Sequence, residues 1–293
     1  MSKKLTVVTY DIETGLSKFV GFRPGEQHVN HKQLLKGYLV TPIICLSYAI
    51  NNAAPKTLVY DLSTASSKKM IEEFDKIIES ADIVIGKNNT RFDDKHLNYH
   101  RMLNKLDGMP EWLGRTEDLE SQMRRFFFMP SYTLDHLSEV MGLGGKTKMD
   151  FSDWVDILML QTVCQFNHKM KQLGSWHSQA VHAYCLQEYN LDEVEVYRRG
   201  QKALDKMIKY NKKDVRDTRA LWNYCIKHFK PKFNQSVHEQ RLVCKQPGCG
   251  SSNIHKNGTR QQGQTVYQNY RCKAHGGYAG RHPVNSKNPR VLH

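Results

Sequence analysis

The chain has 293 residues, enough for one large domain and a small appended one. Hydrophobic residues make up 39% of it, which predicts a polar, soluble globular protein, and no apolar run reaches the ~20 residues that a membrane-spanning helix needs. The formal net charge of +14 predicts a polyanionic partner, either nucleic acid or an anionic membrane surface.

The start of the chain and its cysteines predict a cytoplasmic protein. The opening residues MSKKLTVVTYDIE lead straight into a strand, without the apolar stretch of a signal peptide. Four cysteines are isolated from one another, which is typical of buried thiols in a reducing compartment and not of a disulfide framework. They are Cys45, Cys164, Cys185 and Cys225.

The first third of the chain predicts a mixed sheet. Alternating and apolar runs predict three antiparallel strands at Leu5–Ile12, Ile43–Ile50 and Thr57–Leu62, with a loop over residues 14–37. Helical spacing follows at Ser66–Ser80, and a short strand at Asp82–Gly86. A strand–helix–strand order implies parallel pairing at this point.

The remainder of the large domain is predicted to be helical. We expect helices at Asp93–Leu106, Thr116–Phe128 and Leu134–Met141, a mostly helical stretch over residues 161–205 without a readable motif, and a last helix at Asp205–Phe229. Pro231 cannot continue that helix, so we place the domain boundary there, with one domain at 1–232 and a second at 236–293.

Acidic residues from distant segments are predicted to converge in this domain. Asp11 and Glu13 point to one side of the first strand, because side chains alternate along a strand. Tyr210 and Asp214 share one face of the last helix at i and i+4. With Asp93, the carboxylates could hold a pair of hard cations, which prefer oxygen ligands and suit phosphoryl chemistry.

These residues form three motifs that resemble those of the DEDD superfamily of 3′–5′ exonucleases. D-x-E matches Asp11-Ile12-Glu13, N-x-x-F-D matches Asn89 to Asp93, and Y-x-x-x-D matches Tyr210 to Asp214. The tyrosine places the resemblance in the branch that includes DNA polymerase proofreading domains and phage-encoded stand-alone enzymes. The resemblance covers residues 5–230 and, with the predicted elements, implies an α/β ribonuclease-H-like fold: a mixed sheet flanked by helices.

The resemblance also implies a role for each motif residue with two Mg²⁺ or Mn²⁺ ions. Asp11 would bridge both ions, and Glu13 and Asp214 would hold the ion that carries the attacking water. Asp93 would serve the second ion, partly through water. Tyr210 would orient the water by its hydroxyl, and Asn89 would touch the terminal nucleotide or the loop that carries it.

Each residue has a simpler structural reading when it is taken singly. Asp11 could cap a strand, and Asp214 could be a surface ion pair. Asp93 could cap the following helix, although Asp94 beside it is the better candidate for that cap. Leu119 follows Asp118 where relatives often have an Asp-Thr pair, so we interpret Asp118 as structural. A lysine between the second and third motifs contacts phosphate in some relatives, and Lys146 or Lys148 could do so here.

The second domain is predicted to be a zinc ribbon. Cys244 and Cys249 form one pair of ligands, Cys272 and His275 form the other, and a turn-rich hairpin with an aromatic strand joins them. His282 is a rival to His275 as the fourth ligand. So small a segment has too little core to fold without a metal, which favours one structural Zn²⁺.

The composition of the second domain predicts a nucleic-acid surface. Residues 236–293 contain nine Lys or Arg residues against the single acid Glu239. Cations can bind phosphates, and the rings of Tyr267, Tyr270 and Tyr278 can stack on bases.

The sequence therefore predicts a metal-dependent 3′–5′ exonuclease that releases mononucleotides from DNA, from single strands or frayed 3′ ends. We expect a free-standing enzyme in a bacterial or phage-infected host cell, acting in trans with a polymerase or a recombination protein. A 3′–5′ exoribonuclease is the rival enzyme, because the same chemistry hydrolyses RNA and no motif reports contacts to the 2′-OH. Two further alternatives come from other classes. One is a non-catalytic nucleic-acid-binding protein, and the other is a transposase or integrase, in which the catalytic acidic residues follow a different order along the chain.

Overall fold

The computed structural model describes most of the chain, and it contains two separate sheets. The described residues are 6–18, 31–35, 40–106, 116–144, 148–174, 178–226, 228, 242–246, 249, 251–262 and 265–284. Pro231, where the sequence predicts the domain boundary, lies outside them. Among the helices of the described residues, none combines the length and the apolar character that crossing a bilayer requires.

The larger sheet is mixed and has five strands in the order β3-β2-β1-β4-β5. The strands are β1 (Val7–Thr14), β2 (Ile43–Ile50), β3 (Lys56–Val59), β4 (Ile83–Gly86) and β5 (Thr116–Asp118). β2 pairs antiparallel with β1 and β3, whereas β4 pairs parallel with β1 and β5. This arrangement confirms the predicted α/β, ribonuclease-H-like fold with a mixed sheet.

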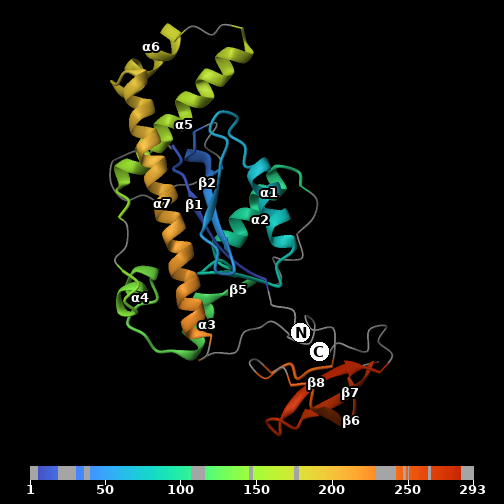
Figure 1. The fold of residues 1–293 in the computed structure, drawn as a ribbon. Helices are drawn as coiled ribbons and strands as arrows, with labels where there is room; N and C mark the ends of the chain where they lie inside the picture. Colours follow the sequence, from blue (N-terminus) through green and yellow to red (C-terminus); the bar gives the residue numbers. More distant parts are fainter. Residues whose placement is uncertain are drawn as a thin grey trace.

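Helices cover both faces of this sheet (Figure 1). One face carries α1 (Lys68–Glu79) and α2 (Asp93–Leu103), and the other carries α3 (Leu119–Phe126), α4 (Leu134–Val140), α5 (Phe151–Gln172) and α7 (Glu193–Cys225). α6 (Ser178–Tyr189) joins α5 and α7 beyond the sheet through a small core that includes Val163, Val181 and Val196. Gly200 allows α5 and α7 to approach closely, because a Cβ there would lie 2.4 Å from the Cβ of Leu160.

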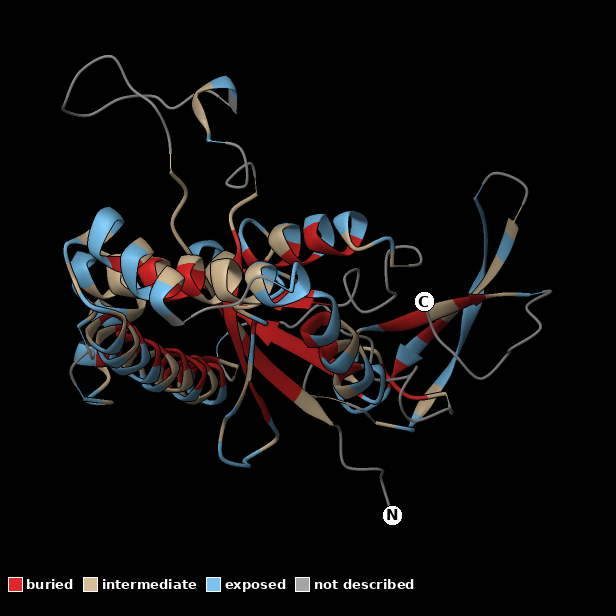
Figure 2. Ribbon diagram, turned by 90° about the horizontal axis from the view of Figure 1, so that it is seen from above, coloured by how far each residue is buried: buried red, intermediate tan, exposed pale blue. Residues whose placement is uncertain are grey.

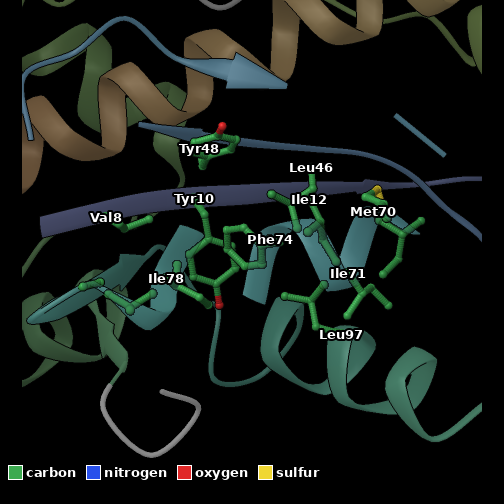
Figure 3. Close-up of a cluster of buried hydrophobic side chains, with 13 residues drawn as sticks. Val8, Tyr10, Ile12, Leu46, Tyr48, Met70, Ile71, Phe74, Ile78 and Leu97 are labelled. Carbon is green, nitrogen blue, oxygen red and sulfur yellow. The ribbon is translucent and has the colours of Figure 1, made fainter. Parts of the chain in front are cut away.

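Alternation along β1 divides its side chains between the two faces. Val8, Tyr10 and Ile12 pack with Phe74 and Ile78 of α1 (Figure 3). Because the period of a strand is two, Asp11 and Glu13 must point to the opposite face, against which α7 packs. Figure 2 shows the strands as the buried centre of the domain, with exposed residues on the outer surfaces of the helices.

Several predicted boundaries differ from the structure. Thr116–Asp118 is a strand and not the start of a helix, because it pairs with Val84–Gly86; its three polar residues carry no apolar strand pattern. The last helix begins at Glu193 and not near Asp205, and Asp192 caps it by accepting a hydrogen bond from the Glu195 backbone N–H. It ends at Cys225.

The smaller sheet is a three-stranded antiparallel meander in the order β6-β7-β8. Its strands are β6 (Ile254–Gln262), β7 (Thr265–Cys272) and β8 (Tyr278–Pro283). In the loop 31–35, the short 3₁₀ helix η1 (His31–Gln33) completes the elements of the described residues.

Candidate functional site

Three carboxylates from two distant segments meet between β1 and α7. Asp11, Glu13 and Asp214 each offer an oxygen within 4.8 Å of the others. Asp11 and Glu13 are half-buried at the end of β1, and Asp214 is 8% exposed on α7. The sheet and the helix that covers it therefore bring together residues that lie about 200 positions apart.

Asp93 lies beside this group at the start of α2. Its Oδ1 accepts a hydrogen bond of 3.0 Å from the backbone N–H of Ile12, which ties the second motif to the first. Asp93 is close enough to raise the pKa of Asp11, although it is not one of the three clustered carboxylates. Burial raises the pKa of Asp93 to about 7, against the hydrogen bond from Ile12, which lowers it.

The electrostatics of the group favour a bound cation. Burial raises the pKa of Asp11 well above its usual range, and the neighbouring Asp93, Glu13 and Asp214 raise it further, whereas Lys87 lowers it. Like charges held this close in a poorly solvated place disfavour ionisation unless positive charge compensates them. Clustered carboxylate oxygens are also the ligands that Mg²⁺ and Mn²⁺ prefer, so the donor set fits such ions.

Asn211 is a buried partner of the carboxylates that the sequence analysis did not identify. Its side-chain NH₂ donates a hydrogen bond of 2.6 Å to Oδ2 of Asp11, and the residue is fully buried. Its Oδ1 has no hydrogen-bond partner among the described residues. Asn211 and Asp214 are three residues apart on α7, and this i, i+3 spacing was the available signal that both face β1.

Tyr210 lies one turn before Asp214, to which its side chain is hydrogen-bonded. Burial raises the pKa of the Tyr210 hydroxyl far above its ordinary value, and Asp214, Glu13 and Asp11 raise it further. The hydroxyl therefore stays protonated and can act as a hydrogen-bond donor.

Asn89 and Asp94 belong to a buried network with Tyr10, whose ring lies on the α1 side of β1. Asn89 is fully buried, and its NH₂ donates to the Tyr10 hydroxyl (3.4 Å) and to Asp94 (3.3 and 3.4 Å). The Tyr10 hydroxyl itself donates to Asp94. A Cβ at Gly86 would lie 2.5 Å from the Cβ of Asn89, so the loop needs glycine there. Asn89 thus supports the loop before Asp93, while its contact with a nucleotide stays a prediction.

The structure corrects the interpretation of Asp94 and supports that of Asp118. Asp94 does not cap α2: it is buried, and it also accepts a hydrogen bond of 2.9 Å from Thr116. Asp118 caps α3 by accepting from the Ser121 backbone N–H, and it accepts from Thr90 as well. These hydrogen bonds are in keeping with the structural interpretation of Asp118.

The two candidate phosphate-binding lysines have different outcomes. Lys148 is exposed just before the α5 cap Asp150, and Lys146 lies outside the described residues. A phosphate contact by Lys148 stays a prediction.

A second group of potential metal ligands lies at the end of the small sheet where β6 begins and β7 ends. Atoms of Cys244, Cys249, Cys272 and His275 all lie within 4.8 Å of one another. The Sγ atoms of Cys249 and Cys272 are 3.7 Å apart, and Nε2 of His275 is 3.1 Å from Sγ of Cys244. A disulfide would need about 2.05 Å, whereas two thiolates on one tetrahedral zinc at ~2.3 Å lie about 3.8 Å apart. The group can therefore bind a metal ion.

His282 and Tyr270 lie next to this group without belonging to it. Their rings stack at 5.3 Å, and Tyr270 is 5% exposed within the core that includes Cys244 and Cys272. The prediction that Tyr270 stacks on a base is therefore corrected, because its ring is in the interior. Tyr267, three residues earlier, is only half-buried.

Comparisons with known proteins give a distant likeness. No protein-family model matches the chain, and no curated protein matches it. Among the solved structures that match is the family B DNA polymerase from the hyperthermophilic archaeon Pyrobaculum calidifontis, with 14% sequence identity and a TM-score of 0.48. The match covers 83% of this chain and 26% of the polymerase, so the chain spans about a quarter of the length of that protein.

Proposed function

We propose that the chain is a metal-dependent 3′–5′ exonuclease that hydrolyses DNA, at single-stranded or frayed 3′ ends, to mononucleotides. The observation that carries the proposal is the convergence of Asp11, Glu13 and Asp214 within 4.8 Å of one another. Tyr210 is hydrogen-bonded to one of them. Three-motif order and spatial convergence together support nuclease chemistry, while the 3′–5′ direction and the choice of DNA rest on the sequence resemblance.

The residues at the site divide between metal binding and positioning. Asp11, Glu13 and Asp214 would hold two Mg²⁺ or Mn²⁺ ions together with Asp93. Bound there, such ions supply an activated water and neutralise the charge that develops on the phosphate. Asn211 holds Oδ2 of Asp11 by its hydrogen bond and so fixes the position of this carboxylate.

Tyr210 would orient the attacking water. Its single hydroxyl hydrogen is directed to Asp214, so the hydroxyl would hold the water beside the carboxylates and does not act as a base. We expect Tyr210→Phe to lower the single-turnover rate about 10- to 100-fold with little effect on folding, because one positioned hydrogen bond is lost. Rapid-quench measurement of the first cleavage checks this, and an unchanged rate would contradict the assignment.

The small sheet completes the proposed enzyme as a second domain, residues 236–293, with nucleic acid as its partner. The Cys244, Cys249, Cys272 and His275 group would hold one structural Zn²⁺ there. The nuclease domain, residues 1–232, would act in trans with a polymerase or a recombination protein.

The product ladder tests the activity directly. DNA and RNA oligonucleotides labelled at the 5′ end, single- and double-stranded, are incubated with Mg²⁺ or Mn²⁺. We expect single-stranded DNA to shorten one nucleotide at a time, and phosphorothioate linkages at its 3′ end to slow this. The divalent ion is omitted in the control and not chelated, because a chelator would also attack the cysteine group.

The alternatives leave different products. Immediate release of a labelled mononucleotide would show 5′–3′ polarity, and discrete internal fragments would show an endonuclease. A ladder from RNA alone would replace the proposal with an exoribonuclease. No cleavage of any substrate with either ion would refute it.

A further inference from the structure

The register of the small sheet places its side chains on two unlike faces. On the central strand β7, Tyr270 and Cys272 point into the core that holds the cysteine group. Tyr267, Asn269 and Arg271 therefore point to the opposite face, because side chains alternate along a strand.

Neighbouring strands add residues to this opposite face. Directly paired residues share a face of a sheet. Arg260 of β6 is paired with Tyr267, Arg281 of β8 with Asn269, and Tyr278 of β8 with Arg271. We call this set, Arg260, Tyr267, Arg271, Tyr278 and Arg281, the outer face of the ribbon.

The cations and rings of the outer face are interleaved. The guanidinium of Arg281 lies 4.2 Å from the centre of the Tyr267 ring, and the Lys245 ammonium lies 5.6 Å from that of Tyr278. Nε of Arg271 donates a hydrogen bond of 2.6 Å to the Gly276 carbonyl, which fixes its guanidinium at the surface. Tyr278 is 43% exposed, and Arg260 and Arg271 are exposed.

Acidic side chains are missing from this part of the sequence. After Glu239, the chain contains no Asp or Glu up to His293. The basic residues of α7 differ in this respect, since Arg198 pairs with Glu195 and Lys206 with Asp153. The cations of the outer face thus have no acid within the ribbon to neutralise them.

We propose that the outer face binds single-stranded nucleic acid. Bases would stack on Tyr267 and Tyr278, and phosphates would bind Arg260, Arg271 and Arg281. Rings that accept any base, combined with unneutralised guanidinium groups, are the combination that single strands require. A duplex would engage only the cations, since its bases are already stacked. The inference deepens the proposed function by assigning its nucleic-acid partner to one face.

Binding measured in the full-length chain tests this proposal. The chain carries Asp11→Asn so that no substrate is degraded, and fluorescence anisotropy follows a labelled single-stranded oligonucleotide of about 20 thymidines. We expect Tyr267→Ala to weaken binding about tenfold, since loss of one stacked base has an effect of this size. Tyr267→Phe, which keeps the ring, should retain most of the affinity.

A pair of charge-matched variants separates binding at the outer face from general electrostatic attraction between the basic domain and nucleic acid. Arg281→Gln removes a cation from the outer face, and Lys256→Gln removes one from the strand position paired with buried Tyr270 on the other face. We expect Arg281→Gln to weaken binding several-fold and to reduce the slope of log Kd against log salt by about 0.7 to 1. Lys256→Gln should change affinity less than twofold.

Three results would overturn the proposal. The first is an equal loss of affinity in Arg281→Gln and Lys256→Gln, and the second is an unchanged affinity in Tyr267→Ala. The third is a loss of affinity for a duplex in Tyr267→Ala as great as its loss for the single strand. Zinc content and circular dichroism confirm that each variant is folded. Because cleavage is disabled in every arm, failure of the nuclease activity in the product-ladder experiment and failure of this surface are separate outcomes.

Discussion

Replacing Asp11 by asparagine is expected to abolish metal-dependent cleavage and to stabilise the metal-free protein. The substitution keeps the shape of the side chain, and its amide oxygen can still accept the hydrogen bond from Asn211. It removes one charge from a cluster in which Asp93, Glu13 and Asp214 all raise the pKa of Asp11. Losing a ligand of the ions that neutralise the reacting phosphate costs several kcal/mol, which is about three powers of ten in rate.

The stability change has the opposite sign for the same reason. Without ions, the crowded carboxylates destabilise the fold, so Asp11→Asn should raise the Tm of metal-free protein by a few degrees, given that about 1 kcal/mol moves Tm by ~2–4 °C at this size. Manganese should raise the Tm of the wild type, because it binds the folded state. Manganese should leave the Tm of Asp11→Asn nearly unchanged.

Asp205→Asn is the matched control for this experiment. Asp205 is exposed on α7, the helix that carries Asp214, and it accepts a hydrogen bond from Gln201. Cleavage and the manganese-induced rise in Tm should both persist in this variant. Wild-type cleavage rates in Asp11→Asn, or equal losses in both variants, would show that the carboxylate cluster is not the active site.

The sequence predicted the elements that carry a strong local pattern. β2 was predicted with its exact ends, because Ile43–Ile50 is an apolar run, interrupted only by Ser47, that is buried on both faces as far as Ala49. β1 extends two residues beyond the prediction, to Thr14, and this extension keeps Asp11 and Glu13 inside the strand. The order of these elements along the chain predicted a mixed sheet, and the observed strand pairing confirmed it.

Elements whose stability comes from tertiary pairing were missed. β5 is three buried polar residues, Thr116–Asp118, and only its pairing with β4 makes it a strand. The first part of α7, from Glu193, packs on α5 through Gly200, a residue that a helical pattern disfavours.

The spacing of motif residues predicted which carboxylates converge, but not what surrounds them. Alternation in β1 and the i, i+4 spacing in α7 are local rules. They were therefore enough to predict that Asp11, Glu13 and Asp214 converge. Asn211 and Asp94 are long-range hydrogen-bond partners, reaching Asp11 and Tyr10 across 200 and 84 positions. Polar residues of that kind look like surface residues until the fold is known.

The other large effect is expected from Cys272→Ser, which should release the metal and unfold the small sheet. Apart from the potential ligands, the core of the described part of this sheet consists of Tyr270 and Ala279, with Leu242 and Ile254 packed against them. Such a core cannot offset the conformational entropy of about 40 residues. Apparent zinc affinities of ~10–16 kcal/mol in comparable small domains show how much of the folding free energy a metal can supply.

Metal content and hydrogen exchange measure this outcome separately. One equivalent of zinc should be present in the wild type and absent from Cys272→Ser, with amide protection lost over residues 251–284 and kept in β2. Cys164→Ser is the control: Cys164 is a half-buried residue of α5, remote in sequence from the group, and should keep the zinc. Full zinc occupancy in Cys272→Ser would place the metal elsewhere.

The same variant separates substrate binding from chemistry. The carboxylate cluster is built from β1 and α7, which include no residue of the small sheet, so kcat should be unchanged in Cys272→Ser. KM should rise, because the outer face of the ribbon is lost along with the fold. His275→Gln should reproduce both effects, whereas His282→Gln, which alters only the ring stacked on Tyr270, should keep the zinc. Zinc loss in His282→Gln and zinc retention in His275→Gln would instead make His282 the fourth ligand.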